Sequence, residues 1–268
     1  MTAVGNIHPT AVVHPSARID PAAEIGPYAV IGEDTVIGAR TKVGPHAVIE
    51  FATIGQDNKI FPGCFIGTAP QDLKYAGQKT RFVMGDRNTV REAAHLNRGT
   101  TATGETRIGS ECLIMAFTHI AHDCRVGNRV ILVNNSGLAG HVEVADNVII
   151  STQVGVHQFV RVGRWVMISA GSMVGKDVPP FCYAQGDRAR LRGLNLVGLR
   201  RSGLPRQNLS ALKEAYKTLF LSGLLQEEAL RRLKSSPQPP EAQEFIAFVE
   251  GSKRGVMRPT AEPEEVEA

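Results

Sequence analysis

The residues in this sequence best suited to chemistry are two histidines three positions apart, with an acidic residue directly after the second. His119, His122 and Asp123 lie in the stretch IMAFTHIAHDC, residues 114–124. A neutral imidazole can remove a proton from an alcohol near neutral pH, and a carboxylate can fix its tautomer and stabilise the cation that forms. Three chemistries remain open: a general base, a zinc site built from three histidines, and recognition of an anionic phosphate.

The elements that position these histidines follow from a repeat. Aliphatic residues recur every six positions from Ile7 to Ile49, resume at Ile54 after a shift of one residue, and recur again from Met84 to Val174. This second run counts Ala102 as a repeat position. A period of six fits neither a helix nor an alternating strand, but it fits a short strand followed by a tight turn, with glycine or asparagine at the corner to supply a positive φ. Three such units close one triangular coil of a parallel β-helix.

Residues one coil apart then lie on the same face, about 4.8 Å from each other. Ile120, Leu138 and Val156 are predicted to stack, whereas His8, His14 and His46 near the N-terminus are expected to be surface residues. Adjacent residues of a strand point to opposite sides, so Asp123 can orient His122 only if the chain turns a corner there. The prediction is that four histidines share one face of three consecutive rungs: His119, His122, His141 and His157.

Two segments depart from the repeat. Residues 67–83 carry Asp72 and Gln78 where the period requires aliphatic residues, so this segment is expected to leave the coil as a loop. After Val174 the repeat stops, and from about Leu194 apolar residues at three- and four-residue spacing predict helices. We therefore expect three parts: a β-helix over residues 1–190, a helical region over 191–256, and a disordered tail over 257–268.

The composition fits this plan. The 268 residues are 43% hydrophobic and only 6% aromatic, with 27 glycines and 15 prolines, which argues against a helical bundle. No apolar run reaches about 18 residues and no secretory signal begins the chain, so we expect neither a transmembrane segment nor export, and a cytoplasmic location. A formal charge of +4 does not imply nucleic acid. The four cysteines, Cys64, Cys112, Cys124 and Cys182, are expected to be reduced core residues.

Several motifs resemble the UDP-N-acetylglucosamine O-acyltransferase family of lipid A biosynthesis, and the resemblance covers nearly the whole chain. QDLKYAG at residues 71–77 and HIAHDC at residues 119–124 are its most specific parts. The resemblance implies a mainly β fold, a left-handed parallel β-helix of hexapeptide repeats with a small α-helical C-terminal region. The other matching segments are residues 134–135, 138–141, 157–159, 177–180, 184–186 and 195–199.

The resemblance also implies an activity: transfer of an (R)-3-hydroxyacyl chain from acyl carrier protein to the 3-hydroxyl of UDP-N-acetylglucosamine, the first step of lipid A biosynthesis. His122 matches the general base, Asp123 its partner carboxylate, and the Gly140 N–H the oxyanion donor. No covalent intermediate, metal or cofactor is expected. Ala170 matches a position associated with acyl chain length. Substrate-contacting positions are matched by Asp72, Lys74, His119, His141, His157, Gln158, Asn195 and Arg201.

The family is a homotrimer with its active site between neighbouring coils, and a basic cluster between Arg188 and Arg206 is a candidate surface for the acidic carrier protein. The chain departs from better-known members at Asn97, where they have histidine, and at Ser202, where some have arginine. Asn97 leaves open whether the acceptor is the 3-amino sugar analogue, which would give an amide. Two other interpretations remain: a zinc-dependent hydratase resembling the β-helical carbonic anhydrases, and a structural β-helix without enzymatic activity.

Overall fold

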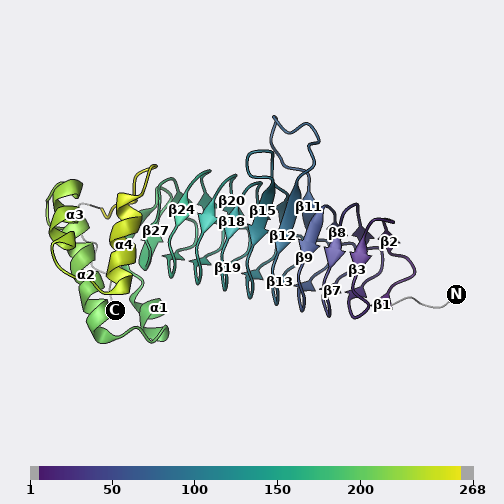
Figure 1. Ribbon diagram of the computed structural model, residues 1–268, viewed down its shortest axis with the longest axis horizontal. Coiled ribbons are helices and arrows are strands. Elements are labelled where there is room, and N and C mark those ends of the chain that lie inside the picture. The colour runs from purple at the N-terminus through teal and green to yellow at the C-terminus, as the bar shows by residue number, and fades with distance from the viewer. Residues whose placement is uncertain (1–5, 261–268) are drawn as a thin grey trace.

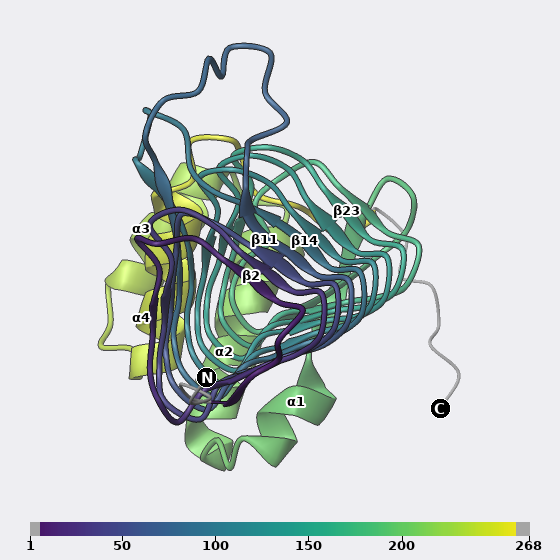
Figure 2. The same ribbon diagram turned by 90° about the vertical axis from the view of Figure 1, so that its right-hand side faces the viewer.

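The computed structural model describes residues 6–260. Within these residues, twenty-eight strands of two to five residues wind into a long coil, and four helices cover its C-terminal end (Figure 1). Viewed along its axis, the coil has a triangular cross-section (Figure 2). Three sheets form its sides, and from β1 to β27 consecutive strands of the chain pass from one sheet to another.

Sheet A is the longest of the three. Its strands pair in parallel, apart from the last pair, which is an antiparallel hairpin. Its members are β1 (Asn6–Ile7), β4 (Glu24–Ile25), β7 (Lys42–Val43), β10 (Lys59–Ile60), β13 (Thr89–Val90), β16 (Leu113–Ile114), β19 (Ile131–Leu132), β22 (Ile149–Ile150), β25 (Met167–Ile168), β27 (Cys182–Gln185) and β28 (Arg190–Leu194).

Sheet B carries the strand that begins with His119. It consists of β2 (Val12–Val13), β5 (Val30–Ile31), β8 (Val48–Ile49), β11 (Phe65–Thr68), β14 (His95–Asn97), β17 (His119–Ile120), β20 (Gly137–Leu138), β23 (Gly155–Val156) and β26 (Met173–Val174). Sheet C consists of β3 (Arg18–Ile19), β6 (Val36–Ile37), β9 (Ala52–Ile54), β12 (Arg81–Met84), β15 (Glu105–Ile108), β18 (Arg125–Val126), β21 (Glu143–Val144) and β24 (Arg161–Val162).

The core is the predicted column of aliphatic residues. Ile120 pairs with Leu138 and Leu138 with Val156, and all three side chains are buried. Hydrogen bonds link positions 18 apart, such as the Asn128 N–H and the Asp146 carboxylate, which confirms the coil length. All four cysteines are buried, as expected, and free.

The corners differ from the prediction, because most residues with a positive φ are neither glycine nor asparagine. Asp123, His141 and Phe159 have φ values of 60°, 62° and 63°. This conformation costs about 1–2 kcal/mol per residue, and hydrogen bonds between neighbouring coils offset it. Glycines that follow the aliphatic residue instead allow close packing: a Cβ at Gly26 would lie 2.9 Å from the Val43 carbonyl oxygen of the next coil.

Two excursions leave the coil at the corner that joins sheet B to sheet C, here called the B–C corner. The expected loop lies between β11 and β12, and it stands out from the coil in Figures 1 and 2. A second excursion, residues 98–104, was not predicted. Met84 pairs with Ile108, 24 positions on, so this coil contains six extra residues and the six-residue count continues unbroken through them. Ala102 is therefore not a core position but an exposed residue of the excursion.

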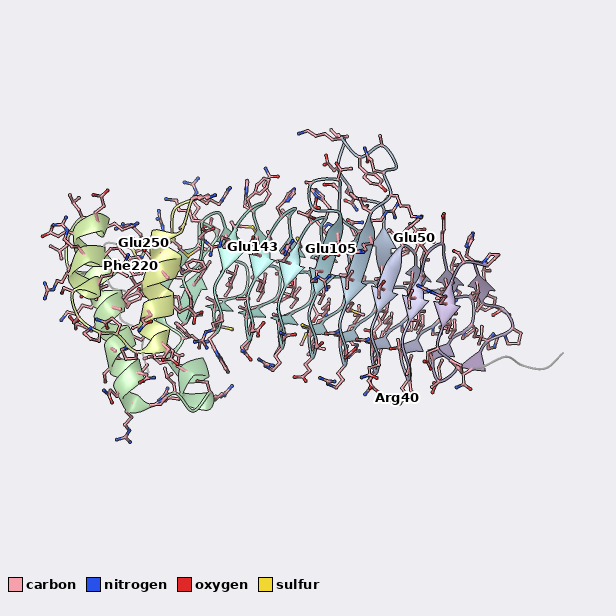
Figure 3. The ribbon with its side chains drawn as sticks, in the orientation of Figure 1. Arg40, Glu50, Glu105, Glu143, Phe220 and Glu250 are labelled. Atoms are coloured by element: carbon pink, nitrogen blue, oxygen red, sulfur yellow. The ribbon has the colours of Figure 1, made fainter. Side chains whose placement is uncertain are left out.

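The C-terminal region consists of α1 (Leu196–Arg201), α2 (Arg206–Phe220), α3 (Gln226–Lys234) and α4 (Pro240–Glu250). Aromatic contacts between Tyr216, Phe220 and Phe245 join α2 to α4, and Figure 3 marks Phe220 among the helices. The expected disordered tail is wrong for residues 257–260: Met257 is 2% exposed and hydrogen-bonds to Asp177 of the coil. Residues 261–268 lie outside the described part.

Candidate active site at the B–C corner

The candidate site lies where the chain passes from sheet B to sheet C in three successive coils. His122 and Asp123 follow β17, Gly140 and His141 follow β20, and residues 157–159 follow β23. In Figure 3 the label of Glu50 marks this corner in an earlier coil, and the labels of Glu105 and Glu143 mark the sheet C strands β15 and β21, which begin just after it. The four histidines predicted to cluster are thus at this corner or, for His119, on the sheet B strand that leads into it.

His122 and Asp123 form a hydrogen-bonded pair. The His122 Nδ1 lies 2.8 Å from the Asp123 Oδ2. Adjacent residues can make this contact because Asp123 has a φ of 60°, so the chain turns between them. The carboxylate fixes Nδ1 as the protonated nitrogen of a neutral ring. Nε2 is then the free base.

The Asp123 carboxylate is anchored from the second excursion. Thr100 donates its backbone N–H at 3.0 Å and its hydroxyl at 2.7 Å, and the Thr103 hydroxyl also donates. Burial of Asp123 opposes its ionisation, but these hydrogen bonds and that from His122 outweigh burial and lower the pKa of the carboxyl. The carboxylate is therefore charged at neutral pH.

His141 and Gly140 complete the surroundings of His122. The His141 ring stacks on Phe159, with centroids 4.5 Å apart, and lies edge-on to His122 at 5.3 Å. A Cβ at Gly140 would lie 2.6 Å from the His122 Cε1, so only glycine fits against this imidazole. Within residues 6–260 the Gly140 N–H donates to no protein acceptor, which leaves it available beside the base.

A stripe of outward-facing residues on sheet B leads away from the corner. His95, His119, Gly137, Gly155 and Met173 are paired in register, one per coil. The glycines make the floor of a groove of about 660 Å³ that runs from His119 to Met173. Burial lowers the pKa of both His95 and His119, so these imidazoles are neutral at pH 7.

His157 and Gln158 are exposed at the same corner. His157 lines the groove. Its Nδ1 lies 2.8 Å from a guanidinium nitrogen of Arg254, which comes from the chain beyond α4. Gln158 makes no side-chain hydrogen bond within the described residues.

The expected loop is tied to the site at its base. The Gln71 amide lies 3.4 Å from the His95 Nδ1, and the buried Arg98 hydrogen-bonds to the Tyr75 hydroxyl and pairs with Glu50 at 3.0 Å. Asp72 caps a turn by accepting the Lys74 N–H at 3.0 Å. Neither Asp72 nor Lys74 contacts the histidines within one protomer.

Three predicted residues lie away from the B–C corner. The Asn195 side chain caps α1 and donates to the Trp165 carbonyl at 2.9 Å, at the corner joining sheets C and A, and Arg201 is exposed in the last turn of the same helix. Ala170 is exposed at the corner joining sheets A and B. Within one chain the structure does not bring these residues to His122.

Sequence reasoning missed His95, Thr100, Thr103 and Arg254. His95 precedes a core leucine as His119 precedes Ile120, and His95 pairs with His119. The repeat therefore held a signal for His95. The threonines lie in the excursion that the period concealed. Arg254 is 97 residues from His157, and nothing in the local sequence links them.

The zinc interpretation can be compared with the geometry. Among the described residues one group has ligand atoms close enough to hold a metal: His122, Asp123 and His141. It contains two histidines rather than three, and Asp123 is engaged by His122 and two threonines.

No helix among residues 6–260 has the length and apolar composition to cross a bilayer.

Comparison with protein-family models gives two matches. Residues 177–257 match the second domain of UDP-N-acetylglucosamine O-acyltransferase, and residues 16–51 and 105–140 match the bacterial transferase hexapeptide repeat. The hexapeptide match and the solved relatives confirm the left-handed parallel β-helix with a small helical C-terminal region.

Relatives at high coverage carry one activity in their names. An acyl-[acyl-carrier-protein]–UDP-N-acetylglucosamine O-acyltransferase of Verminephrobacter eiseniae is 47% identical over 95% of this chain and 100% of the relative. The crystal structure of the UDP-N-acetylglucosamine acyltransferase of Francisella novicida is 40% identical, with a TM-score of 0.92 and 95% coverage of both chains. That of the O-acyltransferase of Moraxella catarrhalis is 44% identical, with a TM-score of 0.92, and covers 94% of this chain and 100% of that one.

Proposed function

The chain belongs to the UDP-N-acetylglucosamine O-acyltransferase family, and from this premise we propose how its residues carry out the reaction. The chain is an acyltransferase of lipid A biosynthesis. The reaction we assign to it is transfer of an (R)-3-hydroxyacyl chain from acyl carrier protein to the 3-hydroxyl of UDP-N-acetylglucosamine. The observation that carries the mechanism is the His122–Asp123 pair beside the free Gly140 N–H, next to an apolar groove.

His122 is the general base. Its Nε2 takes the proton of the sugar hydroxyl while the oxygen attacks the thioester carbonyl, and Asp123 stabilises the imidazolium through Nδ1–H. The Gly140 N–H donates to the oxyanion of the tetrahedral intermediate. Collapse breaks the carbon–sulfur bond, and the proton held by His122 goes to the departing thiolate. No acyl-enzyme forms, and no cofactor is required.

The acyl chain occupies the groove along sheet B. Gly137 and Gly155 leave room for a methylene chain over the backbone, and a Cβ at Gly155 would lie 2.9 Å from the Met173 sulfur. Met173 therefore closes the groove three coils beyond His119. Ala170, proposed from the family resemblance to affect acyl length, would have to act from a neighbouring protomer.

The remaining substrate contacts require an assembly. We assign contacts with the sugar nucleotide to His119, His141, His157 and Gln158 at the B–C corner, to Asp72 and Lys74 of the loop, and to Asn195 and Arg201. Because Asn195 lies at a different corner and Arg201 lies in the helix that follows it, we propose that they reach His122 from a second chain, which a cyclic homotrimer would supply.

The partners and the compartment follow from the same assignment. Acyl carrier protein is acidic, and the basic cluster offers it a complementary surface at the helical end of the coil. We place the enzyme in the cytoplasm, where acyl carrier protein is found. The members of the cluster are Arg188, Arg190, Arg192, Arg200, Arg201 and Arg206.

Asn97 bears on the choice between an ester and an amide product. Its side chain is fully buried and donates to the Ala69 carbonyl at 2.8 Å, so it fixes the base of the loop rather than facing the groove. We therefore propose the ordinary sugar as acceptor. Turnover of the 3-amino analogue at a higher kcat/KM would reverse this assignment.

The test is an assay of UDP-N-acetylglucosamine with 3-hydroxyacyl carrier protein, following the acylated sugar nucleotide. His122→Ala should lower kcat by about 10²–10⁴-fold, the usual contribution of a general base. His46→Ala is the matched control, because His46 stacks on Tyr28 at the N-terminal end of the coil. Wild-type turnover in His122→Ala would refute the assignment of His122 as the general base. Loss of turnover with a chelator, restored by zinc, would favour the metal interpretation instead.

A further inference from the structure

We propose that Arg254 is a positioning residue, which holds His157 as a neutral imidazole with its proton on Nε2. The proposal rests on the proposed function, because it gives His157 the role of a hydrogen-bond donor toward a substrate oxygen in the groove. Arg254 belongs to the segment beyond α4, which Figure 1 shows in yellow returning to the coil.

The contact itself determines which nitrogen of His157 carries the proton. A guanidinium nitrogen of Arg254 lies 2.8 Å from the His157 Nδ1, and the Arg254 Nε donates to the Gly175 carbonyl at 2.9 Å. A guanidinium has five N–H donors and no acceptor. Nδ1 must therefore offer a lone pair, and the single proton of the neutral ring must be on Nε2.

A second group competes for the same nitrogen. The Gln158 carbonyl oxygen lies 3.2 Å from the His157 Nδ1, and this oxygen can only accept. The two contacts require opposite tautomers and cannot form together. The Arg254 contact is shorter and charge-assisted, so it prevails. Without Arg254 the ring would place its proton on Nδ1, bonded to Gln158, and Nε2 would become an acceptor.

The segment that carries Arg254 is fixed on both sides. The Ser252 hydroxyl donates to the buried Asp177 carboxylate at 2.8 Å, and the Gly255 carbonyl accepts the Asp177 N–H at 3.1 Å. Val256 beyond it is 5% exposed. Arg254 is thus held between two attachments to the coil, and it does not need to lose much conformational freedom when it binds His157.

The position of His157 shows what Nε2–H would meet. His157 lines the groove on sheet B, whereas Arg254 lines a separate hollow on the sheet C side, with Asp123 and His141. The imidazole therefore separates the two hollows, with Nδ1 turned toward Arg254. We infer that Nε2–H faces the groove, where its partner is an acceptor oxygen such as the thioester carbonyl or an oxygen of the sugar nucleotide.

The direct test is the ¹⁵N spectrum of histidine-labelled protein at neutral pH, with the His157 signals assigned from their loss in His157→Asn. Wild type should show the Nε2–H tautomer at His157. Arg254→Ala should shift this residue toward Nδ1–H, whereas Lys253→Ala, which removes an equal charge from an exposed neighbour, should not. An unchanged tautomer in Arg254→Ala, with a folded trimer, would overturn the proposal.

Kinetics supply a second readout. Arg254→Ala should lower kcat/KM for the sugar nucleotide by about 10–100-fold, the range observed when a group that orients a metal-bound histidine is removed. Arg254→Lys should recover part of the loss, since one ammonium can donate to either of the two acceptors. A loss of activity in Arg254→Ala no larger than that in Lys253→Ala would also overturn the proposal. The ¹⁵N measurement of the tautomer does not depend on turnover. Failure of the wild-type acyltransfer assay would therefore count against the proposed function alone.

Discussion

Asp123 shows how a single residue combines folding and chemistry. Its backbone makes the corner, its carboxylate orients His122, and the same carboxylate ties down the second excursion through Thr100 and Thr103. The excursion thus provides donors that keep a buried carboxylate ionised. A dyad of adjacent residues is possible only because the corner has a positive φ.

Replacing this carboxylate should affect activity and pH-dependent stability together. The pKa of Asp123 is lower in the folded than in the unfolded chain. Its stabilisation is therefore present above the ordinary aspartate pKa of about 4 and is lost as the pH falls through the lower folded value. Asp123→Asn should be less stable than wild type at pH 7, and the difference in free energy of unfolding should shrink below about pH 4. Urea unfolding at several pH values measures this.

Asp57→Asn is the matched control. The pKa of Asp57 is also lowered, by its hydrogen bond with Arg40, but the pair is exposed and should contribute little. Turnover should be unaffected in Asp57→Asn. In Asp123→Asn much of the turnover should be lost, because His122 is no longer oriented. A stability difference for Asp123→Asn that is independent of pH would contradict the assignment.

At the scale of elements, the strands of sheet B space their outward-facing residues regularly along the groove. Each coil places one outward residue at the same register, so substitution along the stripe changes the groove in steps of one coil, about 4.8 Å. Histidines occupy two of these positions, glycines the next two and Met173 the last. The length available to an apolar chain is therefore set by where the glycines end.

Met173→Gly should lengthen the groove and shift the preferred donor toward longer acyl chains. Each methylene that becomes buried adds about 0.8 kcal/mol, or about fourfold in kcat/KM. Competition between C10, C12 and C14 hydroxyacyl carrier proteins measures the preference. Ala170→Gly is the comparison: if it shifts the profile and Met173→Gly does not, chain length is limited at Ala170 and not at the end of the stripe.

At the scale of the whole molecule, the coil separates groups that the reaction needs together. His122 is at the B–C corner, whereas Asn195 is at the corner joining sheets C and A and Arg201 is at the end of the helix that follows it. One chain therefore offers two incomplete halves of a site. Three chains around a cyclic axis would join each half to the complementary half of a neighbour.

Mixed trimers should test this arrangement. His122→Ala and Arg201→Ala should each be weakly active alone, but trimers assembled from an equal mixture should recover about a quarter of wild-type activity, since one interface in four has both residues intact. A mixture of His122→Ala with His141→Ala should not recover, because both residues lie at one corner of one chain. Absence of recovery in the first mixture, with mixed trimers present, would place the complete site within a single protomer.

The sequence by itself determined the coil, the stacking of Ile120, Leu138 and Val156, and hence the approach of the histidines at one corner. It could do so because a regular repeat converts separation along the chain into position in space. The expected loop was also visible, since polar residues at core positions cannot be buried without cost. The family resemblance supplied the reaction.

Only the tertiary structure decided the rest. The second excursion adds six residues to its coil and so leaves the period intact, and Thr100 and Thr103 could not be separated from the coil by counting. The φ of Asp123, which joins it to His122, depends on hydrogen bonds between coils. Arg254 meets His157 across 97 residues because the chain returns to the coil after α4, and contacts of this kind follow from packing, which no local pattern encodes.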